Sequence, residues 1–84
     1  METNEIIYCL KKIVKPYVQN DVAFQDFGQG TDFIKDLEIN SANLVDIVLD
    51  VEDEFNIAID NDSMDNMTTV NDAVRIIKSK QKQA

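Results

Sequence analysis

The segment from Asp36 to Ile57, which reads DLEINSANLVDIVLDVEDEFNI, is the most informative part of the sequence about the fold. From Asn40 to Asn56 its apolar residues recur with the period of an α-helix, so that one narrow arc of the helix must be buried. That arc consists of Leu44, Ile47, Val48, Val51 and Phe55. Asn40 stands immediately before the first turn, and asparagine is a favoured N-cap residue. The pattern therefore predicts an amphipathic helix over residues 40–56.

The opposite arc of this helix is acidic and is expected to face solvent. It holds Ala42, Asp46, Leu49, Asp50 and Asp53, with Val45 at its flank. Between Asp36 and Val74 the sequence has eleven acidic residues and no basic one, so no cation on this helix offsets their repulsion. An exposed apolar residue among charges of one sign suits docking to a basic surface better than it suits stability. The alternative is an acidic face that is merely solvated.

A first helix is predicted before this one, from Thr3 to about Lys15. Its apolar stripe consists of Ile6, Leu10, Ile13 and Tyr17, with Ile7 and Val14 alongside. Thr3 or Asn4 is expected to cap its start, and Pro16 is expected to end or kink it. Residues 18–40 then predict a long loop, which the aromatic side chains of Phe24, Phe27 and Phe33 attach to the core, with room for a helical turn near residues 32–36.

A last helix is predicted from Val70 onward. Thr69 and Asp72 have the spacing of a capping box, with aspartate in place of glutamate. Val70, Ala73, Val74 and Ile77 form its apolar stripe. The segment 57–68 predicts a loop with one helical turn. The expected fold is therefore all-α: one domain over residues 1–84, with three main helices, one short helix and a long loop between the first two main helices.

Composition excludes several classes of function. The chain has 84 residues, a net charge of −8 and no histidine. It is too short for a two-domain enzyme and cannot build a Ser-His-Asp or Cys-His catalytic unit. No metal site is expected, since the single cysteine, Cys9, excludes a thiolate cluster, and residues 60–71 lack the glycine and glutamate of a calcium loop. Cys9 is expected to be a half-buried hydrophobe rather than a redox thiol.

The acidic balance argues against binding to nucleic acid or to an anionic membrane. No apolar run is long enough for a membrane span, and the first residues do not resemble a signal peptide. A cytoplasmic protein without a membrane span is therefore expected.

Around residues 36–57 the chain resembles an acyl carrier protein. The family pattern is D-L-x-x-D-S-L, an acidic helix ending in E-E-F-x-I, a distant isoleucine, T-T-V-x-D-A and a final helix. This sequence has Ile59 followed by Thr68, Thr69, Val70, Asp72 and Ala73 at that spacing. The resemblance covers residues 33–77 without a gap. Several linked matches make it far more specific than one short motif.

The resemblance implies that Ser41 is esterified with 4′-phosphopantetheine, which a separate holo-carrier synthase transfers from coenzyme A. The thiol of this arm would carry acyl groups as thioesters for fatty-acid, polyketide or related lipid biosynthesis, and the carrier itself would not be an enzyme. Ser41 is expected in the first helical turn, open to solvent, where the helix dipole favours a phosphodiester. The expected partners are that synthase and acyl-transferring or synthase enzymes with basic docking surfaces, which the chain would meet as a monomer.

Two positions depart from the family pattern. Asn40 replaces the aspartate that in the family helps to hold the metal ion used during transfer, and Ala42 replaces a large docking side chain. Both favour a specialised carrier over the general one of fatty-acid synthesis. Two alternatives remain open: an aminoacyl or peptidyl carrier, and a carrier-like interaction domain that is never modified.

Overall fold

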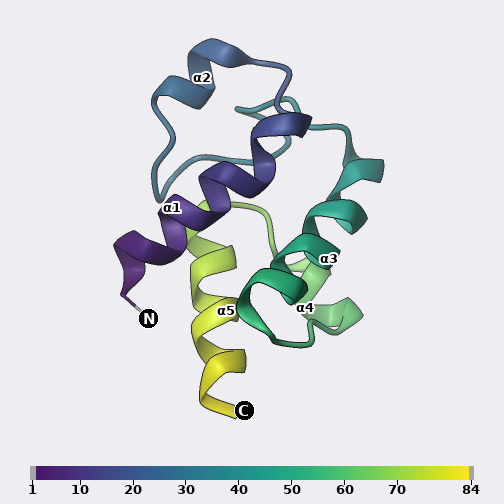
Figure 1. Cartoon of the computed structure of the whole chain (residues 1–84). Coiled ribbons are helices and arrows are strands. Elements are labelled where there is room, and N and C mark those ends of the chain that lie inside the picture. The colour runs from purple at the N-terminus through teal and green to yellow at the C-terminus, as the bar shows by residue number, and fades with distance from the viewer. Residues whose placement is uncertain (1, 84) are drawn as a thin grey trace.

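The computed structural model describes residues 2–83, which form a bundle of helices joined by loops (Figure 1). Three helices are long: α1 (Thr3–Val14), α3 (Leu44–Phe55) and α5 (Val70–Gln83). The short elements are η1 (Lys15–Tyr17), α2 (Asp21–Gln25), η2 (Ser41–Asn43) and α4 (Asn61–Asp65), where η marks a 3₁₀ helix. In Figure 1 α1 runs upward, whereas α3 and α5 both run downward. No helix among the described residues is long and apolar enough to cross a membrane.

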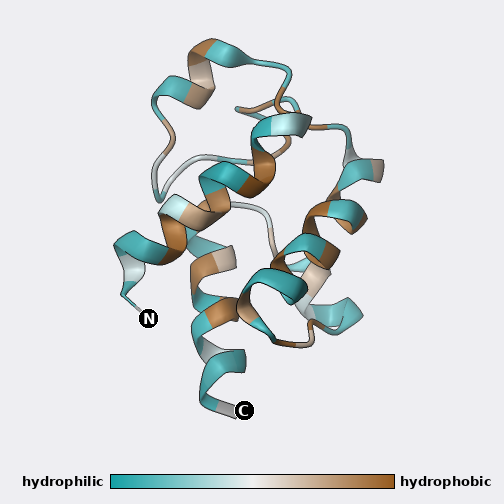
Figure 2. Cartoon of the chain, viewed as in Figure 1, coloured by the Kyte–Doolittle hydropathy of each residue, from teal (hydrophilic) through white to brown (hydrophobic). Residues whose placement is uncertain are grey.

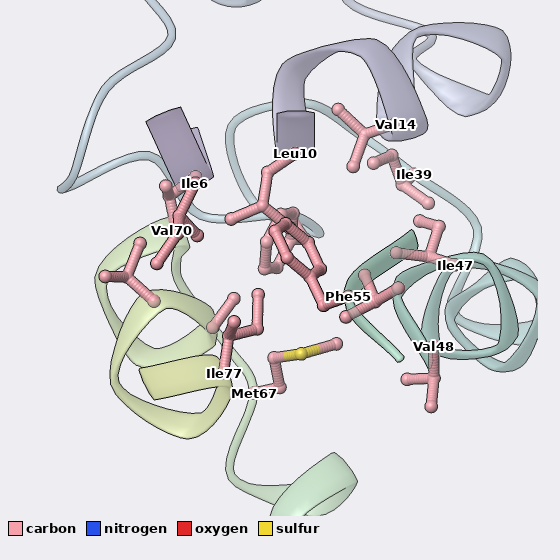
Figure 3. Close-up of a cluster of buried hydrophobic side chains, with 14 of the residues drawn as sticks. Ile6, Leu10, Val14, Ile39, Ile47, Val48, Phe55, Met67, Val70 and Ile77 are labelled. Carbon is pink, nitrogen blue, oxygen red and sulfur yellow. The ribbon is translucent and has the colours of Figure 1, made fainter. Parts of the chain in front are cut away.

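The apolar stripes of the three long helices meet in one core. Figure 2 shows that apolar and polar residues alternate around each of these helices, and Figure 3 shows the apolar side chains converging from all three. The buried apolar residues are Ile6, Leu10, Val14, Phe33, Leu37, Ile39, Ile47, Val48, Val51, Phe55, Met67, Val70, Ala73, Val74 and Ile77. Burying one such side chain completely stabilises the fold by about 2 kcal/mol. The fold class predicted from the sequence is confirmed.

The first helix ends where the proline predicts, because α1 stops at Val14 and a 3₁₀ turn containing Pro16 follows. Val14, which was predicted beside the apolar stripe, is fully buried, whereas Ile13, which was predicted within it, is only half-buried. The predicted cap was wrong. Glu2 is the N-cap residue and makes no side-chain cap bond. The hydroxyl of Thr3 instead contacts the Lys78 ammonium on α5, which ties the two helices together.

The long loop contains a helix that the sequence did not predict. α2 has only five residues, too few for a hydrophobic period, and its start is capped by Asn20, whose Oδ1 accepts a hydrogen bond from Ala23 N at 3.2 Å. The predicted turn is present, since Asp36 N donates to Asp32 O at 3.1 Å. Phe33 is fully buried, whereas Phe24 and Phe27 are half-buried and pack against the core. The aromatic side chains therefore attach the loop as predicted.

The predicted capping box at the start of α5 is confirmed in both directions. Thr69 N donates to Asp72 Oδ2 at 3.1 Å, and Asp72 N donates to Thr69 Oγ1 at 3.2 Å. Val70 N also donates to Thr31 O at 2.9 Å. This last bond joins the start of α5 to the long loop, which brings that loop close to the C-terminal third of the chain.

Candidate functional site

Ser41 is the first residue of η2, the 3₁₀ turn that leads into α3, and it is exposed. The chain before it is held in place, because Ile39 is buried and its N–H donates to Phe33 O at 3.1 Å. Asn40 then caps the turn as predicted, with Oδ1 accepting from Ala42 N at 3.0 Å. A fixed segment thus presents the Ser41 hydroxyl to solvent at the head of a helix.

A shallow hollow of about 270 Å³ lies beside Ser41. It is lined by Ile34, Ser41, Leu44, Val45, Met64, Asp65, Met67 and Thr68. Three separate segments contribute to it: the long loop, the start of α3, and α4 with the residues after it. Most of these side chains are apolar, so the hollow can shelter an apolar group attached near Ser41.

The acidic arc of α3 faces solvent as its spacing indicates. Ala42, Asp46, Asp50 and Asp53 are exposed, and Val45 and Leu49 are 50% and 54% exposed. In the part of the chain that the structure describes, neither Asp46 nor Asp53 forms a hydrogen bond or ion pair through its carboxylate. We call the set of Ala42, Val45, Asp46, Leu49, Asp50 and Asp53 the acidic face.

Tyr17 reaches the acidic face from η1, which the sequence did not predict. Its hydroxyl donates to Asp50 Oδ2 at 3.3 Å. Partial burial, and then the negative charges of Asp50 and Asp46, raise the pKa of the Tyr17 phenol above its ordinary value of 10.0. Helical spacing placed Tyr17 in the apolar stripe of the predicted first helix but could not show that its hydroxyl reaches Asp50.

Cys9 is half-buried, as the sequence predicts. Burial first, and then the neighbouring carboxylate of Glu54, raise the pKa of the Cys9 thiol above its ordinary value of 9.0. A thiol of this kind is a poor nucleophile at neutral pH, because the thiolate is the reactive form. Among residues 2–83 no three or more metal-ligating side chains gather to form a candidate metal site.

Comparison with known proteins identifies the family. Residues 21–77, which include Ser41 and the acidic face, match the family described as "phosphopantetheine attachment site". The chain is 35% identical over 81 residues to the acyl carrier protein of Lactobacillus acidophilus, with 96% of this chain and 99% of that protein covered. It is 35% identical over 78 residues to the acyl carrier protein of Sinorhizobium fredii (93% and 97% covered). It is 37% identical over 76 residues to that of Picosynechococcus (90% and 91% covered).

Each of these matches spans nearly the whole length of both proteins and includes the segment that forms the site. On this evidence the chain belongs to the acyl carrier protein family, so that it is an acyl carrier whose covalently attached group is 4′-phosphopantetheine.

Proposed function

We propose that Ser41 is the residue that bears 4′-phosphopantetheine. The observation that carries this proposal is the exposed hydroxyl at the head of α3, next to a hollow with an apolar lining. The helix dipole favours an anion at this end, so a phosphodiester on Ser41 would be stabilised there. The other serines have weaker claims, because Ser63 lies within α4 and Ser79 lies within the last turns of α5.

The chemistry requires little of this chain. The Ser41 oxygen forms a bond to the phosphorus that carries the pantetheine, the phosphoanhydride of coenzyme A breaks, and the nucleotide portion leaves. The separate holo-carrier synthase accepts the hydroxyl proton and supplies the catalysis. This chain positions the hydroxyl through Asn40 and Ile39 and keeps it accessible. When bound, the arm supplies a thiol that forms thioesters with acyl groups.

The acidic face is the proposed docking surface for the enzymes that use the carrier. Asp46 and Asp53 have no partner among the described side chains that would compete with an incoming lysine or arginine. Leu49 adds exposed apolar area within this face, and Val45 adds more at its flank. Such a surface speeds encounter with basic partners and fixes their register, and its effect is screened by salt.

Membership of this family indicates a carrier rather than a catalyst, and it implies contact with transferases and synthases. The proposal goes further in four respects. The chain itself catalyses no reaction, it forms one domain over residues 1–84, it acts as a monomer, and it works in the cytoplasm. Its replacements at Asn40 and Ala42 support a role in a specialised lipid or polyketide pathway.

The experiment that tests the proposal measures the intact mass of the protein after incubation with a broad-range phosphopantetheinyl transferase and coenzyme A. The wild-type chain should gain one phosphopantetheine group, and Ser41→Ala should gain none. The matched variants Ser63→Ala and Ser79→Ala should be modified at the wild-type rate. If Ser41→Ala still gained the group, or if the wild type gained none, the assignment of Ser41 would be wrong.

A further inference from the structure

The side of α1 that faces away from the core carries lysines and the ring of Tyr8, and Lys15 continues this stripe just after the helix ends. Tyr8, Lys11, Lys12 and Lys15 have the i, i+3, i+4, i+7 spacing of one helical stripe. The buried residues Ile6, Leu10 and Val14 lie on the opposite side of the same helix. Together with Phe24 of α2, the stripe lines a hollow of about 240 Å³. We call Tyr8, Lys11, Lys12, Lys15 and Phe24 the basic-aromatic surface.

Two of the three lysines of this surface, Lys11 and Lys12, lie over aromatic rings, and within the described part of the chain none of the three forms an ion pair with a carboxylate. The ammonium of Lys12 lies 4.7 Å from the centre of the Tyr8 ring, and that of Lys11 lies 5.4 Å from the centre of the Phe24 ring. Among residues 2–82 the ion pairs are Arg75 with Asp72 and Lys80 with Asp60, so no lysine of this surface is paired. Three positive charges therefore lie together, without compensation, on a chain whose net charge is −8.

The helix dipole explains only part of this arrangement. Cations are favoured in the last turn of a helix, and both α1 and α5 have two lysines there. In α5, however, Lys80 pairs with Asp60. In α1 the lysines surround Tyr8, which is 61% exposed. Tyrosine is enriched at protein interfaces, so the exposure of this ring favours a binding role over a purely structural one.

The charge of the surface and the shape of the chain favour one kind of partner. The three lysines contribute +3 to the net charge of −8, so the rest of the chain carries −11. A broad anionic surface such as a bilayer would also face the negatively charged rest of the chain and would be repelled by it. Two copies of this chain would likewise repel each other. A single acidic helix would meet chiefly the lysines, because charges beyond ~10 Å are screened. The stripe from Tyr8 to Lys15 is ~10 Å long, which matches two turns of such a helix.

We propose that the basic-aromatic surface docks an acidic helix of a partner protein. Carboxylates of that helix would pair with Lys11, Lys12 and Lys15, and an apolar side chain would fill the hollow between Tyr8 and Phe24. This surface and the acidic face lie on different helices and have opposite charge. The two surfaces therefore suit partners of opposite charge.

The test uses two synthetic probes and the full-length, ¹⁵N-labelled chain. One is a helical peptide of about 15 residues with glutamates and one leucine on the same face, and the other has lysines in place of the glutamates. The glutamate peptide should shift the amide resonances of residues 8–15 and of Phe24, and the lysine peptide should shift those of α3. Affinity for the glutamate peptide should fall about tenfold between ~50 mM and ~500 mM salt.

A matched pair of variants separates local from net charge. Lys12→Glu and Lys82→Glu change the charge equally, and both positions lie in the last turn of a helix. Lys12→Glu should weaken binding of the glutamate peptide about tenfold, and Lys82→Glu should change it less than about twofold. Tyr8→Ser, at an exposed position, should weaken binding without unfolding the chain.

Four results would overturn the proposal. The first is that the glutamate peptide shifts no amide resonance of α1, and the second is that Lys12→Glu and Lys82→Glu lose the same affinity for it. The third is binding to phosphatidylserine vesicles that depends on Lys12. The fourth is self-association in sedimentation velocity that Lys12→Glu abolishes. The last two would assign the surface to a membrane or to a second copy. The dispersion of the amide resonances of both lysine variants reports that they are folded. This keeps the result independent of whether Ser41 is the attachment residue.

Discussion

The starts of α3 and α5 are capped in different ways. Both helices follow a loop and need partners for the N–H groups of their first turn. At α5 the carboxylate of Asp72 accepts from Thr68 N and Thr69 N, and Thr69 Oγ1 accepts from Asp72 N. At α3 one amide oxygen, Asn40 Oδ1, accepts from Ala42 N, and the first turn is a 3₁₀ helix with exposed residues.

The difference separates a structural helix start from an accessible one. The start of α5 is bonded to the long loop and lies beside fully buried Val70, so it holds two distant segments together. The start of α3 is capped by a single side-chain hydrogen bond and presents a serine to solvent. Stability and accessibility are thus assigned to the starts of two different helices.

The largest effect on stability is expected from removing the stronger cap. Asp72→Ala removes the acceptor of two backbone N–H groups and the partner of Arg75. Unfolding by urea should show a loss of about 2 kcal/mol, because an unsatisfied capped N–H costs more than an exposed bond contributes. Asp72→Asn keeps an acceptor and should lose less. An Asp72→Ala protein as stable as wild type would mean that the two helix starts do not differ in strength.

Removing the Asn40 cap at the start of α3 should reduce stability less than removing Asp72. Asn40→Ala removes the single acceptor for Ala42 N and should cost about 1 kcal/mol in the same urea measurement. The comparison predicts an order, with Asp72→Ala more destabilising than Asn40→Ala. The reverse order would show that the start of α3 carries more of the stability than its geometry suggests.

Lowering the pH should weaken the cap at the start of α5 but not the cap at the start of α3, because Asp72 titrates and Asn40 does not. Partial burial opposes ionisation of Asp72, but hydrogen bonds from Thr69 and Thr68 and the charge of Arg75 outweigh it, so the pKa of Asp72 lies below its ordinary value of 3.8. A lowered pKa contributes stability that is complete above pH 3.8 and is lost as the pH falls through the folded value. The free energy of unfolding of the wild type should therefore decrease as the pH falls below 3.8. In the Asp72→Asn chain the contribution of this group to the decrease should be absent.

How far the sequence could predict these features depends on their length and their chemistry. The apolar period of α3 and the cap at Asn40 could be read because several residues repeat one pattern. The capping box could be read because Thr69 and Asp72 lie three residues apart. α2 was missed because five residues hold no period, although Asn20 followed by Asp21 is a possible signal for its start.

Other features depend on contacts between distant segments. Thr3 is not a cap because Lys78, from the other end of the chain, engages its hydroxyl. The bond from Tyr17 to Asp50 joins residues that lie 33 positions apart. Glu38 has φ 56°, a left-handed conformation that no residue type at that position indicates. The acidic face followed from the helical period, but Ser41 was identified by the family resemblance, because exposure alone does not distinguish it from another helix-start serine.

The smallest effect on stability is expected from Asn40→Asp, which is also the sharpest test of the cap at the start of α3. Aspartate and asparagine cap a helix about equally well, and the dipole slightly favours the anion, so the free energy of unfolding should change by only a few tenths of a kcal/mol. A carboxylate would nevertheless stand next to Ser41, where the family pattern has one. Transfer of phosphopantetheine by a general bacterial transferase should therefore become faster, and Asn40→Ala should show no such gain. Equal rates for wild type and Asn40→Asp would mean that Asn40 serves only as a cap, so that Ala42 alone would support a specialised carrier.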